Sequence, residues 1–138
     1  MREHDEAILV TDAGLLLGTW MTQTLDGQDV RALRAHSGRP LAVTFVRLEG
    51  ELRWHANDVA NAHSGTFSVS AQGRFDAIKQ MITAVGTIDS RPLFRRNPQA
   101  VEQATEARLL PAADGKPPTL RLLGVGTVIA VYTGHAPE

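Results

Sequence analysis

The densest group of polar side chains in the sequence lies between residues 55 and 64 and consists of His55, Asn57, Asp58, Asn61, His63 and Ser64. In an extended chain, the odd-numbered positions of this run share one face and would bring two imidazoles and two amides together. Imidazole titrates near neutral pH, so a histidine paired with a carboxylate or with a second histidine could perform general acid–base chemistry. We therefore take His55, Asp58 and His63 as the candidate catalytic residues.

The same residue types also permit a structural interpretation, which their composition favours. Asn and Asp side chains commonly accept hydrogen bonds from nearby backbone in turns. No metal or other cofactor is predicted, because two histidines with this separation and one nearby Asp match no recurrent zinc spacing. The chain contains no cysteine, which excludes disulfides, thiol nucleophiles and Cys-ligated zinc.

Aromatic side chains provide a second set of candidates. Four of them stand at apolar positions of predicted strands: Trp20, Trp54, Phe67 and Phe75. They would either fill a core or line a cavity for a small apolar molecule. We take these four, together with the polar Asn61, as the candidate ligand-binding residues.

The charge balance limits the classes of partner. The sequence has 14 Lys and Arg against 15 Asp and Glu, a net charge of −1, which argues against nucleic acid as a partner. The cluster of Arg91, Arg95 and Arg96 could hold a carboxylate or phosphate, although a solvated loop is favoured. No apolar run approaches the roughly 18 residues of a membrane span, and no secretory signal is recognisable. We expect a cytoplasmic protein without a membrane partner, in an oligomeric state that the sequence does not indicate.

Short segments of alternating pattern must position these side chains. In the clearest hairpin, residues 41–48 and 51–56, the alternation predicts that Trp54 is buried and Arg53 exposed. Asn97 followed by Pro98 predicts a helix start, with Asn97 as the cap and an end near residue 106. Loss of that cap in Asn97→Ala would cost about 1 kcal/mol. Further strands are predicted at 15–25, 66–70, 74–81, 82–88, 119–123 and 127–132.

These elements predict an α+β, β-rich fold. Strands and helices do not alternate, so we expect one antiparallel sheet, curled into a barrel or half-barrel, with one helix at about 98–106 on its open side. A chain of 138 residues is one domain in size. Its predicted organisation is an N-terminal extension at 1–14, a single domain at 15–133 and a tail at 134–138.

The order of these motifs resembles a known family. Gly18-Thr19-Trp20 opens the first strand, a hairpin follows, and the run at 57–67 leads through Ser64-Gly65 to the last strand pair. This order resembles the META domain family, also called HslJ-like, over about residues 15–133. The resemblance implies a small β-rich fold with a helix and no known catalytic activity. Members are linked loosely to stress response or motility.

The chain departs from that family at its cysteines. Val59-Ala60 stands where the family pattern has glycine–cysteine, and a second cysteine expected near Gly86-Thr87 is missing. Asn61, Ser64 and Gly65 match the loop motif, in which the asparagine is structural. Typical members are exported or membrane-anchored, so the loss of both cysteines fits a reducing cytoplasm.

Two functions remain open. The first is a non-catalytic module that binds a small apolar ligand or a partner. The alternative is a small cofactor-independent enzyme, of isomerase or cyclase type, in which a barrel cavity shapes the substrate and His55, Asp58 or His63 moves a proton. A side-chain-filled interior would count against both, whereas an open cavity of roughly 300 Å³ or more walled by His55 or Asp58 would favour the enzyme.

Overall fold

A computed structural model describes residues 7–35, 38–58, 60–82, 92–113 and 115–134. Within these ranges the chain forms one α-helix, a short 3-10 helix at Ala13–Leu16 and a ten-stranded sheet. The strands are β1 (Ile8–Leu9), β2 (Gly18–Leu25), β3 (Gln28–Asp29), β4 (Ala42–Leu48), β5 (Glu51–Asn57), β6 (Ala62–Val69), β7 (Phe75–Ile82), β8 (Glu106–Leu110), β9 (Thr119–Gly124) and β10 (Thr127–Gly134). No helix in these ranges is long and apolar enough to cross a membrane.

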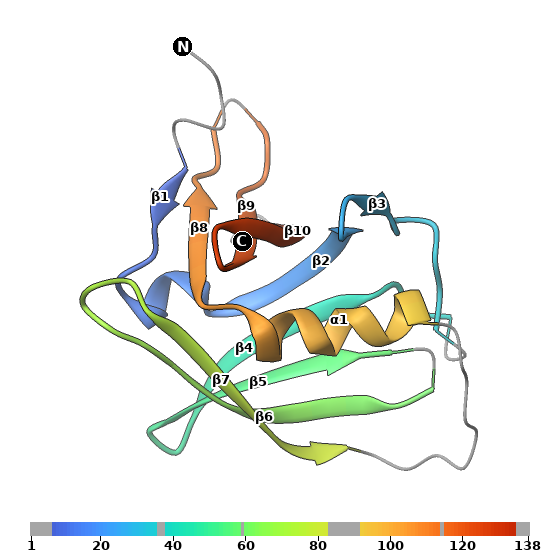
Figure 1. Cartoon of the computed structure of the whole chain (residues 1–138), viewed down its shortest axis with the longest axis horizontal. Helices are drawn as coiled ribbons and strands as arrows, with labels where there is room; N and C mark the ends of the chain where they lie inside the picture. The colour runs from blue at the N-terminus through green and yellow to red at the C-terminus, as the bar shows by residue number, and fades with distance from the viewer. Residues whose placement is uncertain (1–6, 36–37, 59, 83–91, 114, 135–138) are drawn as a thin grey trace.

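The sheet is antiparallel and curls into a half-barrel, as the sequence predicts. Its strand order is β1-β8-β9-β10-β2-β4-β5-β6-β7, with β3 paired to β2. Strands β7 and β8, which lie far apart in this order, approach each other at one point. There the N–H of Phe75, the first residue of β7, donates to the carbonyl of Thr105, just before β8, over 2.9 Å. Helix α1 (Pro92–Gln103) lies across the remaining opening and contacts strands on both sides of it (Figure 1). The single helix therefore covers the side that the sheet leaves open.

The predicted helix boundaries are wrong by several residues. The helix begins at Pro92, and Asn97 and Pro98 lie inside it rather than at its start. Pro92 already supplies the favourable proline at the first helical position. Asn97 is fully buried and bonds to the strands instead of capping the helix. Arg95 and Arg96 are accordingly helical, and Arg91 lies outside the described residues, as does most of the strand predicted at 82–88.

The core lies between the sheet and α1. Phe45, Phe67 and Phe75 form an aromatic cluster with ring-centroid separations of 4.9, 6.0 and 6.2 Å. Trp54 is 0% exposed, whereas the Arg53 side chain is 27% exposed and bonds to Glu51. The predicted register of this hairpin is confirmed, because alternate residues of β5 face the core.

Gly65 shows how tightly the strands approach one another. A Cβ at this position would stand 1.7 Å from the Ile78 carbonyl oxygen of β7. Trp54 lies opposite Gly65 on β5 and donates its indole N–H to the same carbonyl over 3.2 Å. Only glycine leaves room for this approach, at the point where the β6–β7 register shifts.

The two predicted flanking segments contribute to the sheet. Ile8–Leu9 of the predicted extension pairs with β8, and the adjacent Val10 is 1% exposed. At the other end, β10 continues to Gly134, whose N–H donates to the Pro118 carbonyl. The packed part of the chain therefore begins before residue 15, since β1 adds an edge strand next to β8 and Val10 is buried beside it.

Candidate functional site

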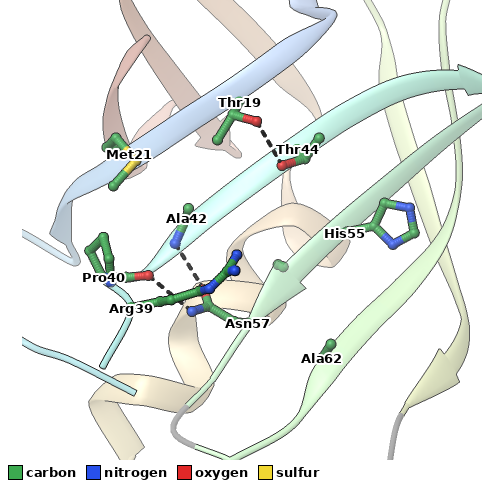
Figure 2. A pocket seen from close by; sticks show the side chains of 10 residues that line it. Thr19, Met21, Arg39, Pro40, Ala42, Thr44, His55, Asn57 and Ala62 are labelled. Carbon is green, nitrogen blue, oxygen red and sulfur yellow. Dashed lines mark hydrogen bonds between the residues drawn. The ribbon is translucent and has the colours of Figure 1, made fainter. Parts of the chain in front are cut away.

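An open cleft of about 480 Å³ lies over the outward-pointing side chains of β2, β4, β5 and β6 (Figure 2). Its lining residues are Thr19, Met21, Arg39, Pro40, Ala42, Thr44, His55, Ala56, Asn57 and Ala62. Strand alternation explains most of this set, because Trp20, Val43 and Trp54 point to the core and their neighbours point outward. Ala56 is the exception, since it faces the core, and Arg39 and Pro40 precede β4. The cleft is thus built on the face of the sheet opposite the core.

A polar row crosses one half of the cleft. Thr19 pairs with Thr44, and Thr44 pairs with His55, so three strands place these side chains in register. The two threonine hydroxyls are 3.1 Å apart and share a hydrogen bond. His55 is exposed at the end of the row, where its imidazole can meet a ligand. This row offers hydroxyl and imidazole groups to a polar ligand atom.

A second, largely apolar row runs beside the first. Met21 pairs with Ala42, and Asn57 pairs with Ala62. The Asn57 amide joins the two pairs, because its Oδ1 accepts from the Ala42 N–H over 2.8 Å and its Nδ2 donates to the Pro40 carbonyl over 3.0 Å. Asn57 thereby holds the segment before β4, and with it Arg39, at the rim of the cleft.

The electrostatic character of the lining is one-sided. Its described residues include the Arg39 guanidinium and the His55 imidazole, and no Asp or Glu is among these described residues. The described part of the chain also contains no cluster of His, Asp and Glu able to hold a metal ion. A guanidinium can bind an anionic group through charge-assisted hydrogen bonds.

A buried polar network supports the cleft from behind. The Asn97 Nδ2 of α1 donates to the Asn57 carbonyl over 2.8 Å and to the Ala42 carbonyl over 3.0 Å. Its Oδ1 accepts from the Thr22 hydroxyl over 2.6 Å. Asn97 is 0% exposed, so water cannot reach its amide, and these bonds satisfy the amide in place of water. They fix α1 against β2, β4 and β5 directly beneath the cleft.

The three candidate catalytic residues do not form one site. Asp58 and His63 are joined, with 2.8 Å between the carboxylate Oδ2 and the imidazole Nε2, and both side chains are about nine-tenths buried. His55 pairs across the sheet with Ser64 rather than with His63, which faces inward beside Ala56. The extended arrangement of the run is wrong, because the chain reverses where the Asp58 N–H donates to the Asn61 carbonyl. The two histidines consequently point to opposite faces.

The turn interpretation of this run is confirmed. Asp58 Oδ1 accepts the backbone N–H groups of Asn61 over 2.7 Å and Ala60 over 3.0 Å. Burial by itself would raise the pKa of Asp58, but the hydrogen bonds from His63, Asn61 and Ala60 together lower that pKa below its usual value. Among the described residues, the buried His63 Nδ1 has no hydrogen-bond partner. Asp58 therefore organises the turn as an ionised carboxylate.

The candidate ligand-binding aromatics pack in the core. Trp54 and Phe75 are 0% exposed, Trp20 is 5% exposed and Phe67 is 6% exposed. None of the four lines the cleft, and neither does Asn61, which stands in the turn after Asp58. Their apolar alternation marks the core face of each strand, and the cleft is formed by the residues between them.

Sequence reasoning missed Thr19, Thr44 and Arg39 as cleft residues. The two threonines occupy polar, outward positions of predicted strands, which is a usable local signal. That signal does not say which strand lies beside which. The pairing of β2 with β4 joins residues 25 positions apart and brings the two hydroxyls together.

Comparison with known proteins supports the fold and goes no further. No family model matches the chain, and no curated protein is similar to it in sequence. An NMR structure of a protein from Burkholderia xenovorans is similar, with a TM-score of 0.61 over 94% of this chain and 91% of that one. The two chains are 12% identical, so the similarity is one of fold.

Proposed function

We propose that the protein is a non-catalytic binding module whose outer cleft holds a small molecule with an anionic group and an apolar body. The observation that carries this proposal is a cleft of about 480 Å³ whose described lining includes the Arg39 guanidinium, the His55 imidazole and the Thr19 and Thr44 hydroxyls. Its volume falls within the roughly 300–1,000 Å³ of small-molecule sites. The ligand class differs from the purely apolar molecule that the aromatic residues suggested, because Trp54, Phe67 and Phe75 pack in the core and none of the four lines this cleft.

Each half of the cleft has a role in this proposal. A guanidinium can bind a carboxylate through two parallel hydrogen bonds, so Arg39 would receive the anionic group from the rim. The Thr19 and Thr44 hydroxyls and the His55 imidazole would contact remaining polar atoms. Met21 and Ala42 would cover the apolar body, where burial of each methylene contributes about 0.8 kcal/mol.

The cleft has the volume and the His55 wall that were expected to favour the enzyme, but it lies outside the packed core rather than in a barrel interior. A binding role is still preferred over catalysis because the acid–base groups are divided. His55 lines the cleft, whereas Asp58 and His63 form a buried pair on the other face. A cofactor-independent isomerase or cyclase in this cleft would depend on His55 alone for proton transfer. Turnover of a bound carboxylate that is abolished in His55→Gln would favour that alternative.

Membership of a META-like, cytoplasmic group, with a stress-related role, is a further part of the proposal. Gly65 of the matched motif allows the close approach of β7, and Asn61 closes the turn that Asp58 organises. These structural roles of Gly65 and Asn61 are what we expect if the motif is characteristic of a fold and not of a catalytic activity. The lack of cysteine agrees with a reducing compartment.

The ligand class can be tested by NMR titration of the full chain with hexanoate and with the uncharged hexanamide. We expect hexanoate to shift the amide resonances of Thr19, Thr44 and His55, and hexanamide to bind more weakly. Arg39→Gln should weaken hexanoate binding about tenfold, which corresponds to ~1.4 kcal/mol.

Arg47→Gln provides the matched control, because Arg47 is an exposed arginine on β4 that does not line the cleft. It should leave the affinity for hexanoate unchanged. Equal binding of the acid and the amide, or shifts confined to other parts of the molecule, would overturn the proposed function.

A further inference from the structure

A second hollow, of about 470 Å³, lies at the end of the half-barrel beside the start of β2. It is lined by Leu15, Leu17, Gly18, Thr19, Trp20, Leu109, Pro111, Ala112, Pro118 and Gly134. These residues come from the 3-10 helix, the first residues of β2, the end of β8, the segment before β9 and the end of β10. Segments distant in sequence therefore converge on this hollow.

The lining of the second hollow is apolar and partly open to solvent. None of its residues is charged, and the Trp20 indole N–H is already donated to the Leu16 carbonyl over 2.8 Å. Leu15 and Leu17 are 50% and 38% exposed. Exposed leucines beside a hollow are unfavourable in water and favourable under an apolar ligand. Among the described residues of this lining, Thr19 and Trp20 are the ones with a polar side-chain atom, and the others offer apolar side chains or glycine to a hydrocarbon.

Thr19 lines both the outer cleft and the second hollow. Its neighbour Gly18 has no side chain, and a Cβ there would meet no atom within 4 Å. The outer cleft and the second hollow meet at Thr19, and the neighbouring Gly18 has no side chain to separate them. One molecule can therefore extend past Thr19 from the outer cleft into the second hollow. The polar rim at Arg39 and the apolar lining at Leu15 and Leu17 then lie at its two ends.

We infer that the two hollows together bind one amphipathic ligand, a carboxylate on a linear alkyl chain. The carboxylate meets Arg39 and His55 in the outer cleft, and the chain passes Thr19 and Gly18 to lie against Leu15, Leu17 and Trp20. This inference rests on the proposed function, which supplies the anionic end. It adds the shape of the ligand, because a compact molecule would occupy the outer cleft alone.

The test is a chain-length series of alkanoates, from butyrate to dodecanoate, titrated into the full chain below their micelle concentrations. Once the chain passes Thr19, we expect affinity to rise about two- to fourfold for each added methylene. The Trp20 indole N–H resonance should shift only with these longer acids. Constant affinity beyond hexanoate would overturn the inference while leaving the proposed function in place.

Variants separate the two ends of the ligand. Leu17→Asn should remove most of the gain from added methylenes and leave hexanoate affinity unchanged, whereas Leu48→Asn, at an exposed leucine outside both hollows, should change neither. Dodecanoate binding that does not depend on Arg39 would overturn the inference, because the apolar hollow would then act alone. Failure of every acid to bind would overturn the proposed function as well.

Discussion

The two faces of the β5–β6 hairpin use the same kinds of residue for opposite purposes. On the inner face, His63 and Asp58 are buried and bonded to each other over 2.8 Å. On the outer face, His55 is exposed beside Thr44 in an open cleft. An imidazole engaged by a buried carboxylate stabilises a turn, whereas one left in an open cleft can bind a ligand. Residue type alone therefore does not separate a buried histidine in a turn from an exposed one in a cleft, and the face of the strand does.

The largest expected effect comes from the buried network below the cleft. Asn97→Ala would leave the Thr22 hydroxyl and the carbonyls of Ala42 and Asn57 without their buried partner. We expect a loss of about 3 kcal/mol in unfolding free energy, several times that of a lost helix cap. Chemical denaturation measures it.

Gln99→Ala on the same helix is the control, because Gln99 is only partly buried and bonds to the Arg96 side chain. It should cost less than about 0.5 kcal/mol. Equal effects of the two substitutions would mean that the Asn97 network does not anchor α1.

The inner pair predicts a smaller, pH-dependent effect. Because the folded pKa of Asp58 is lowered, its carboxylate stabilises the fold above the unfolded pKa, near 3.8, and this contribution is lost as pH falls through the folded pKa. Asp58→Asn should cost about 1–2 kcal/mol at pH 7. Its stability should also decline less than that of the unmodified protein as the pH falls below about 4.

Denaturation midpoints from pH 7 down to pH 2 provide this measurement. Asp76→Asn, at an exposed carboxylate on β7, is the matched control and should retain the acid sensitivity of the unmodified protein. An Asp58→Asn variant with unchanged acid sensitivity would show that the buried pair does not stabilise the folded state.

The smallest effect on stability is expected at the outer histidine. His55→Gln should change the unfolding free energy by less than about 0.5 kcal/mol, because the side chain is exposed. The same variant should weaken hexanoate binding, as measured by NMR titration. A large loss of stability, with ligand affinity unchanged, would reverse the roles assigned to the two faces.

Local patterning predicted the longer strands β2, β4 to β7, β9 and β10, because alternation is visible in consecutive residues, but it did not predict β1, β3 or most of β8. Trp54 and Phe67 are buried as their positions in period-two segments require. The helix was predicted less well, since Asn97-Pro98 imitates a helix start while the actual start lies at Pro92. A buried asparagine bonded to distant strands has the same local sequence as a capping asparagine.

The candidate site depended on information that no local pattern contains. The sequence identified a β-rich half-barrel and an unusual polar run, because alternation and turn chemistry act between near neighbours. Tertiary structure decided that the turn at Asp58 sends His55 and His63 to opposite faces. It also decided that β2 lies beside β4, which creates the cleft from Thr19 and Thr44. Strand pairing between distant segments depends on how the whole sheet buries its apolar face, and so the cleft is a property of the folded chain.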